Sequence, residues 1–222
     1  MYRRIVKLDD ADRAFFVGDI HGEITKLNNK LDAIGFDKEN DTLFSVGDLI
    51  DRGEDSATCL ELIDKPWFSA VRGNHEQMML DAINNPEDND RSMHWFQNGG
   101  DWFYHMDKSN MVIMSDYAKG AISEMPHVIE LHHRGKVIVI CHADWPFDRY
   151  SHCIDAPEIN ILWSRERVEG RSESGVIAGA DLFVFGHTPL RRPTKIHNQI
   201  YLDTGAVFGK ELAVLSFDEL FE

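Results

Sequence analysis

Five short apolar runs constrain the fold of this 222-residue chain more than any other feature. Each run is rich in Val, Ile, Leu or Phe, spans only a few residues, and ends at a glycine or a polar residue. Runs of this length and composition are typical of β-strands that are buried on both faces. The predicted strands cover residues 15–17, 42–46, 67–71, 137–140 and 182–185.

Helical patterns occupy the intervals between the first three runs. Residues 24–34 carry four apolar side chains at helical spacing, and Gly35 follows as a C-terminal cap. Residues 57–63 repeat this spacing in the next interval. Alternation of strands and helices predicts an α/β fold with parallel strands.

The rest of the chain predicts a single domain over residues 1–222, without internal repeats. Polar stretches at residues 84–90 and 169–175 are interpreted as surface loops rather than linkers. A helical excursion with several aromatic residues is predicted at about residues 77–124, beside the site. Two closing strands are predicted at residues 201–205 and 212–217.

Composition narrows the functional classes. The formal net charge of −15 argues against a nucleic-acid-binding surface. No apolar run approaches the length of a membrane span, and the charged N-terminus is not followed by the apolar region of a secretion signal. The three cysteines, Cys59, Cys141 and Cys153, lack metal-finger spacing. We therefore expect reduced thiols and a cytoplasmic protein.

Polar motifs follow the predicted strands directly. The first three are Gly-Asp-Ile-His-Gly at residues 18–22, Gly-Asp-Leu-Ile-Asp-Arg-Gly at residues 47–53 and Arg-Gly-Asn-His-Glu at residues 72–76. Ligands of open α/β sheets bind beyond the carboxyl ends of the strands, so residues far apart in sequence should converge there. The candidate metal ligands at these ends are Asp19, His21, Asp48, Asn74, His142 and His187.

This ligand set belongs to a two-metal phosphoester hydrolase. A carboxylate at Asp48 could bridge two ions with one oxygen on each. Mixed oxygen and nitrogen ligands without thiolate favour Mn²⁺, Fe or Zn²⁺ over Ca²⁺. An isolated histidine is more often structural, and seven of the eleven are interpreted so. Among these, His132 and His133 are assigned to a solvated turn.

His75 is the candidate acid of the site. It adjoins Asn74 and cannot easily bind the same metal, so it is free to donate a proton. Asp51 would accept its second ring N–H, which would fix the tautomer and the orientation of the ring. A purely structural His75–Asp51 pair is the alternative.

Arginines beside the metal motifs are candidates for binding phosphate. The planar guanidinium matches two phosphate oxygens, and Arg52 and Arg72 lie in the second and third motifs. Arg165 could be a third. Equally, Glu166 and its two neighbouring arginines could form a surface ion-pair cluster, and both interpretations stay open.

At these motifs the chain resembles the phosphoprotein phosphatase family of metallophosphoesterases, most closely its phage lambda-type and bacterial serine/threonine phosphatases. The resemblance runs from about Phe15 to Gly209. It implies an α/β metallophosphoesterase fold, with two mixed β-sheets sandwiched between helical layers. It also implies one metal on Asp19, His21 and Asp48, and a second on Asp48, Asn74, His142 and His187.

The same resemblance implies a mechanism and a substrate class. A water bridging two divalent ions, commonly Mn²⁺, attacks phosphorus directly, and His75 protonates the departing oxygen. The substrates are phosphoserine and phosphothreonine in phosphoproteins or phosphopeptides, and often phosphotyrosine. No regulatory subunit, nucleic acid or membrane partner is implied. Ser164 stands where the lambda-type pattern has Asn, which leaves the setting of Arg165 open.

Two alternative functions share parts of this pattern. A symmetrical diadenosine tetraphosphatase, or another small-molecule phosphoesterase, would use the same metal motifs but typically lacks the acid at Asp51. It also often has Asp in place of Glu76. An inactive phosphoprotein-binding module would have lost a ligand or His75, and this chain keeps them all.

Overall fold

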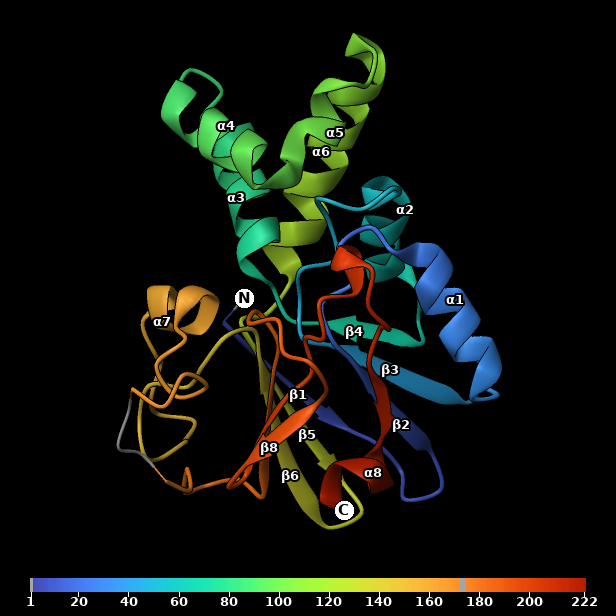
Figure 1. Cartoon of the computed structure of the whole chain (residues 1–222), viewed down its shortest axis with the longest axis vertical. Helices are drawn as coiled ribbons and strands as arrows, with labels where there is room; N and C mark the ends of the chain where they lie inside the picture. The colour runs from blue at the N-terminus through green and yellow to red at the C-terminus, as the bar shows by residue number, and fades with distance from the viewer. Residues whose placement is uncertain (1, 172–174) are drawn as a thin grey trace.

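Two stacked β-sheets form the centre of the structure, a computed structural model that describes residues 2–171 and 175–222 (Figure 1). The six-stranded sheet has the order β1-β5-β6-β7-β9-β8, and the four-stranded sheet has the order β10-β2-β3-β4. In the first sheet the strands are β1 (Arg3–Lys7), β5 (Val128–His133), β6 (Lys136–Cys141), β7 (Leu182–Phe185), β9 (Gln199–Tyr201) and β8 (Thr194–Ile196). In the second they are β10 (Val214–Ser216), β2 (Arg13–Val17), β3 (Asp41–Ser45) and β4 (Phe68–Ala70).

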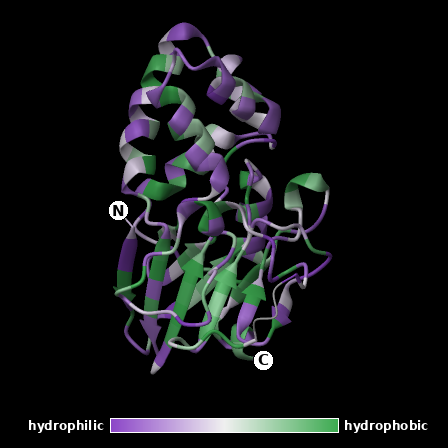
Figure 2. Cartoon of the chain, turned by 90° about the vertical axis from the view of Figure 1, so that its left-hand side faces the viewer, coloured by the Kyte–Doolittle hydropathy of each residue, from purple (hydrophilic) through white to green (hydrophobic). Residues whose placement is uncertain are grey.

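The period-two alternation of strand side chains explains the layers. On β2, Ala14 and Phe16 face the six-stranded sheet and join an apolar cluster with residues of β5, β6 and β7. Phe15 and Val17 point to the other face and pack against the helices. Figure 2 shows the resulting hydrophobic strands below helices of mixed character. Because both faces of these strands are buried, they appear in the sequence as continuous apolar runs.

Strand direction brings the carboxyl ends of the predicted strands together. Strands β2, β3 and β4 are parallel to one another, as are β6, β7 and β9. Antiparallel pairs involve β10, β5 and β8, so both sheets are mixed. All five predicted strands are present, and the predicted α/β class with two mixed sheets is confirmed.

Several details of the chain differ from expectation. Strand β9 ends at Tyr201, so residues 202–205 form a loop in which Asp203 Oδ1 accepts a hydrogen bond from Gly205 N at 2.8 Å. His132 and His133 end β5, and the turn that follows consists of Arg134 and Gly135. Strands β1 and β8, at the two edges of the six-stranded sheet, were not predicted. The closing strand predicted at residues 212–217 is limited to Val214–Ser216, because a helix begins at Phe217. Residues 172–174 of the predicted loop at 169–175 lie outside the described residues.

Helices cover the outer faces of the sheets. Helices α1 (Ile24–Ala33) and α2 (Ser56–Leu60) pack on the four-stranded sheet, and α7 (Glu158–Trp163) packs on the six-stranded sheet. The chain ends in α8 (Phe217–Phe221). No helix in the described part of the chain has the length and apolarity needed to cross a bilayer.

Between β4 and β5 the chain forms a helical block above the sheets (Figure 1). The first helix of this block begins at the third motif, and a π-helical turn connects its two central helices. Gly99 breaks helical geometry in that turn, with φ of 104°. The block comprises α3 (Asn74–Asn84), α4 (Asn89–Trp95), the π turn (Phe96–Gly100), α5 (Asp101–Tyr104) and α6 (Lys108–Glu124).

A buried carboxylate on β5 anchors the six-stranded sheet to the loop that follows β6. Glu130 is 2% exposed and accepts hydrogen bonds from Tyr150 Oη at 2.6 Å, His132 Nε2 at 2.6 Å and His152 Nε2 at 2.5 Å. Burial alone would raise the pKa of Glu130, but these three hydrogen bonds lower it overall. Its negative charge therefore stabilises the fold.

We expect Glu130→Gln to lower the free energy of unfolding at pH 7 by about 1.5–3 kcal/mol, the usual range for a hydrogen bond to a charged group. Because the folded-state pKa is depressed, this stabilisation is present above the unfolded pKa, about 4.3, and is lost as pH falls through the folded-state pKa. Urea unfolding of both proteins between pH 7 and about pH 2.5 measures the difference. Glu124→Gln, at an exposed position, is the control. A difference that stays undiminished well below the unfolded-state pKa would contradict this assignment.

Candidate active site

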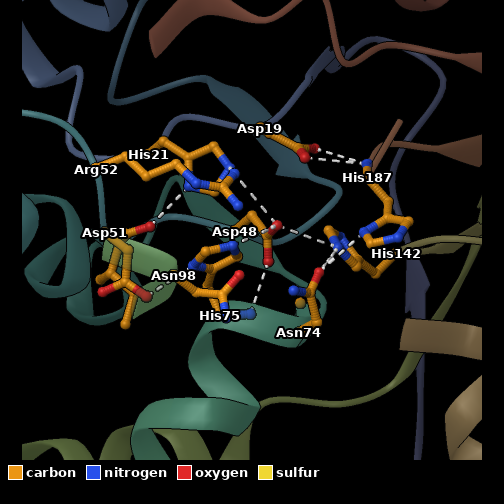
Figure 3. Close-up of polar contacts among 12 residues, drawn as sticks. Asp19, His21, Asp48, Asp51, Arg52, Asn74, His75, Asn98, His142 and His187 are labelled. Carbon is orange, nitrogen blue, oxygen red and sulfur yellow. Dashed lines mark hydrogen bonds and ion pairs between the residues drawn. The ribbon is translucent and has the colours of Figure 1, made fainter. Parts of the chain in front are cut away.

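The loops that follow the parallel strands bring most of the predicted site residues together (Figure 3). The possible ligand atoms form two groups, and within each group all atoms lie within 4.8 Å of one another. One group comprises His21, Asp48 and His75, and the other comprises Asp48, His142 and His187. Asp48 belongs to both groups and lies between them. All of these side chains are buried.

Backbone strain is concentrated at this site. Seven non-glycine residues among those described have positive φ, and five of them are His21, Asp48, Asp51, Arg52 and His187. Each such residue costs on the order of 1–3 kcal/mol and persists only where its surroundings enforce the conformation. The site therefore depends on contacts that hold its loops in place.

Glu76 supplies one set of these contacts by joining the second and third motifs. Its buried carboxylate accepts hydrogen bonds from the backbone N–H of Asp48 at 3.0 Å, Leu49 at 2.8 Å and Gly73 at 2.8 Å. The two loops approach so closely that a Cβ at position 73 would lie 2.1 Å from Asp48 Oδ1. Only glycine fits there.

Backbone carbonyl groups orient two of the histidines. His21 Nδ1 lies 2.8 Å from the carbonyl oxygen of Ile50, and His142 Nδ1 lies 2.7 Å from that of Val46. Since a carbonyl oxygen only accepts hydrogen bonds, each Nδ1 carries the proton. In the neutral rings, Nε2 of both histidines therefore presents a lone pair to the site.

These lone pairs converge with oxygen atoms on the same region. Asn74 Oδ1 lies 2.8 Å from His142 Nε2 and 2.9 Å from His187 Nδ1. Asp48 Oδ2 lies 3.3 Å from His142 Nε2 and 3.7 Å from His21 Nε2. Such a gathering of electron-pair donors away from water is relieved by a proton or a cation. The residues present thus fit divalent metal ions with mixed nitrogen and oxygen ligands.

The charges around Asp48 also favour bound cations. Asp19, which accepts hydrogen bonds from the backbone N–H of His187 at 3.0 and 3.2 Å, has its pKa raised well above normal by burial and by the nearby Asp203 and Asp48. Burial alone would also raise the pKa of Asp48, but His142 and the other imidazoles lower it overall. Three carboxylates this close are stable together only with positive charge among them.

Asp203 is a residue of this site that the sequence analysis did not assign. It is 3% exposed, and burial raises the pKa of its carboxyl group. It lies just beyond the carboxyl end of the parallel strand β9, the same topological position as the predicted ligands. The rule that ligands lie beyond the carboxyl ends of parallel strands would have identified Asp203 if the sequence analysis had placed the end of β9 at Tyr201.

A second cluster adjoins the metal-ligand candidates. His75 Nδ1 lies 2.7 Å from Asp51 Oδ2, and His75 Nε2 lies 3.9 Å from Asp48 Oδ2. Burial lowers the pKa of His75 to about 4 and raises the pKa of Asp51 to about 7. Two indole N–H groups, from Trp95 and Trp102, oppose the rise at Asp51. The sequence placed both tryptophans in the helical excursion but gave them no role.

Of the three candidate phosphate ligands, Arg52 lies at the site. Its Nη1 lies 2.8 Å from His21 Nε2, and its guanidinium lies over the ring of Phe208. The side chain is exposed, so it borders solvent as well as the buried cluster.

Arg72 does not lie at the site, which corrects the sequence prediction. Its guanidinium donates to Gln77 Oε1 at 2.9 Å and to the carbonyl oxygens of Ile122 at 2.7 Å and Ser123 at 3.2 Å. Carbonyl groups at the C-terminus of a helix attract cations, and α6 ends at Glu124. This attraction explains why Arg72 turns away from Asn74, although the two are close in sequence.

Arg165 is exposed at the edge of the site. Burial chiefly lowers the pKa of His187 to about 3, and the positive charge of Arg165 contributes to that shift. Its neighbour Arg167 does not pair with Glu166 but lies 3.2 Å from Asp144, which also accepts a hydrogen bond from Ser164 Oγ at 3.2 Å. Ser164 and Arg167 thereby fix the loop that carries Arg165.

Comparison with known proteins identifies the family. Residues 13–191 match the calcineurin-like phosphoesterase family. The chain belongs to this family. It is 42% identical to serine/threonine-protein phosphatase 1 of Salmonella typhimurium over 96% of this chain and 95% of that protein. It is 40% identical to serine/threonine-protein phosphatase 2 of Escherichia coli, covering 86% of each.

A solved structure shares the phosphoesterase fold. A protein described as a diadenosine tetraphosphatase superposes with a TM-score of 0.64, covering 98% of this chain and 95% of that one, at 24% identity. At that identity the likeness concerns the fold alone. Membership of the calcineurin-like phosphoesterases implies divalent metal ions, in agreement with the donor groups described above.

The two arginines of the second and third motifs should behave differently in this phosphoesterase. Arg52→Gln should weaken inhibition by free phosphate by about tenfold or more, since it removes a charge-assisted contact, and should leave stability nearly unchanged. Arg72→Gln should lower the free energy of unfolding by about 1.5–3 kcal/mol and leave phosphate inhibition of the folded protein unchanged. Phosphate inhibition constants and urea unfolding of both variants test this. Weakened phosphate inhibition in folded Arg72→Gln would show that Arg72 contacts phosphate after all.

Proposed function

We propose that this calcineurin-like phosphoesterase is a metal-dependent protein phosphatase that hydrolyses phosphoserine and phosphothreonine monoesters, and phosphotyrosine as well. The observation that carries the proposal is the buried His75–Asp51 pair beside the metal-ligand candidates, with 2.7 Å between Nδ1 and Oδ2. A serine or threonine leaving group needs a proton donor, and this pair supplies one. Near-full-length similarity to two serine/threonine-protein phosphatases supports the same substrate class.

The ligand sets that we propose are those implied by the sequence motifs: the two groups around Asp48 supply His21, Asp48, His142 and His187, Asp19 and Asn74 are added from the motifs, and His75 is kept as the acid. One ion would be held by Asp19, His21 and Asp48, and the other by Asp48, Asn74, His142 and His187. Two bound divalent ions would activate water and neutralise phosphoryl charge. We propose Mn²⁺ because imidazole and carboxylate donors without thiolate suit it, although the same donors also accept Fe and Zn²⁺.

The side chains around the ions would then act on the substrate. Arg52 and Arg165 would hold the non-bridging oxygens of the phosphoryl group, each from the exposed edge of the site. His75, protonated on both ring nitrogens, would donate its Nε2 proton to the departing oxygen as the P–O bond breaks, and would become neutral. Asp51 would hold Nδ1–H, so that the proton to be transferred stays on the side that faces the site.

Residues 1–222 would form one catalytic domain, in which the helical block carries His75 at the start of α3. Its substrates would be phosphoproteins or phosphopeptides. We also propose a cytoplasmic location, since none of the three cysteines forms a disulfide.

The test compares substrates and leaving groups. After chelation and addition of Mn²⁺, the wild-type protein should hydrolyse a phosphoserine peptide faster than diadenosine tetraphosphate. His75→Asn should then slow hydrolysis of the peptide by about 10²–10⁴-fold, but that of nitrophenyl phosphate far less, because nitrophenolate departs without a proton. Metal content must be equal in both proteins.

Two results would contradict the proposal. Faster hydrolysis of diadenosine tetraphosphate than of the peptide would assign the protein to small-molecule substrates. Equal losses on the two phosphate esters in His75→Asn would show that His75 does not donate the proton. His197→Asn, at an exposed position in the turn between β8 and β9, is the control for replacing a histidine.

A further inference from the structure

The carboxylate of Asp51 is surrounded by donors from two distant parts of the chain. Besides His75, it accepts hydrogen bonds from Trp95 Nε1 at 2.9 Å to Oδ2 and from Trp102 Nε1 at 2.7 Å to Oδ1. Asp51 is 0% exposed. Both tryptophans belong to the helical block, and neither lies in any of the motifs.

Indole groups suit this position for a chemical reason. The indole nitrogen is a donor only, so it can neither remove a proton from the dyad nor rotate to become an acceptor. Two such donors provide a hydrogen bond to each carboxylate oxygen, and one lone pair of Oδ2 remains to accept from His75 Nδ1–H. The orientation of the imidazole then follows from that of the carboxylate.

The aromatic packing behind Asp51 keeps these donors in place. Trp95 is 0% exposed, and its ring lies 6.3 Å from Trp102 and 5.3 Å from Phe103, measured between centroids. Gly100, at the end of the turn, makes room for this arrangement, because a Cβ there would lie 2.4 Å from Trp95 Nε1. The donors are therefore fixed by rigid side chains.

The same turn also supports the strained backbone of the second motif. Asp51 and Arg52 are consecutive residues with φ of 75° and 70°. Arg52 N donates to the carbonyl oxygen of Gly99 at 3.1 Å. A Cβ at Gly99 would lie 2.8 Å from Arg52 N, so the two segments are in direct backbone contact. Residues 95–102 thus hold both the side chain of Asp51 and the backbone beside it.

We propose that Trp95 and Trp102 are positioning residues for proton transfer by His75. They hold the Asp51 carboxylate in the one orientation that directs His75 Nε2 toward the leaving oxygen. This role rests on the function proposed above, and it links the helical block to the chemistry of the strand-end loops.

Removing one indole N–H while keeping an aromatic ring tests the proposal. Trp102→Phe is the main variant, because Trp102 is only partly buried, whereas Trp95→Phe changes the core. We expect kcat on a phosphoserine peptide to fall by about tenfold, below the full value of acid catalysis. The loss on nitrophenyl phosphate should be much smaller, and KM and Mn²⁺ content should not change. Trp67→Phe, which packs on Phe36 and Phe68, is the matched control and should have no effect.

A spectroscopic measurement tests the contact independently of activity. In ¹H–¹⁵N spectra of the full chain, Asp51→Asn should shift the indole resonances of Trp95 and Trp102 and leave that of Trp67 unchanged. Unshifted resonances would overturn the proposal. If the wild type hydrolyses the peptide, two results for Trp102→Phe would also overturn the proposal: equal losses of kcat on the two substrates, or no loss of kcat on the peptide. A wild type inactive on the peptide would instead refute the proposed function, and the positioning of a proton donor with it.

Discussion

The structure depends on the burial of one carboxylate, that of Asp48, among imidazole nitrogens and other carboxylates that offer electron pairs. Asp48 Oδ2 lies within 3.9 Å of a ring nitrogen from each of His21, His75 and His142. Asp19 and Asp203 raise the negative charge nearby. In a region closed to water, this arrangement is stable only with cations among the donors. Membership of the phosphoesterase family and the chemistry of the donor groups therefore both indicate bound divalent metal ions.

Holding such donors together requires unusual backbone geometry, and the fold compensates for it in several places. Five site residues have positive φ, which costs on the order of 1–3 kcal/mol each. Glu76 joins the second and third motifs through backbone N–H groups. Gly99 and the two tryptophans hold the second motif from the helical block. Parts of the chain without ligands thus determine where the ligands lie.

The sequence predicted the features of the structure that depend on local residue patterns. Apolar runs ended by polar motifs located five strands, and the rule for parallel strand ends located most of the cluster around Asp48. Contacts between residues far apart in the sequence could not be predicted in this way. Arg72 was misplaced because its direction is set by carbonyl groups at the end of α6, about fifty residues away in sequence. Trp95 and Trp102 received no role because only the packing of the helical block shows which carboxylate they meet. Asp203 was missed because a strand end was misplaced.

In the function proposed above, Asp48 is shared by two metal ions. Anomalous diffraction at the manganese absorption edge, from crystals grown with Mn²⁺, tests this most directly. We expect two anomalous peaks at the strand ends, with one oxygen atom of Asp48 next to each ion or one oxygen between them. A single peak, or two peaks of which only one contacts Asp48, would contradict the account.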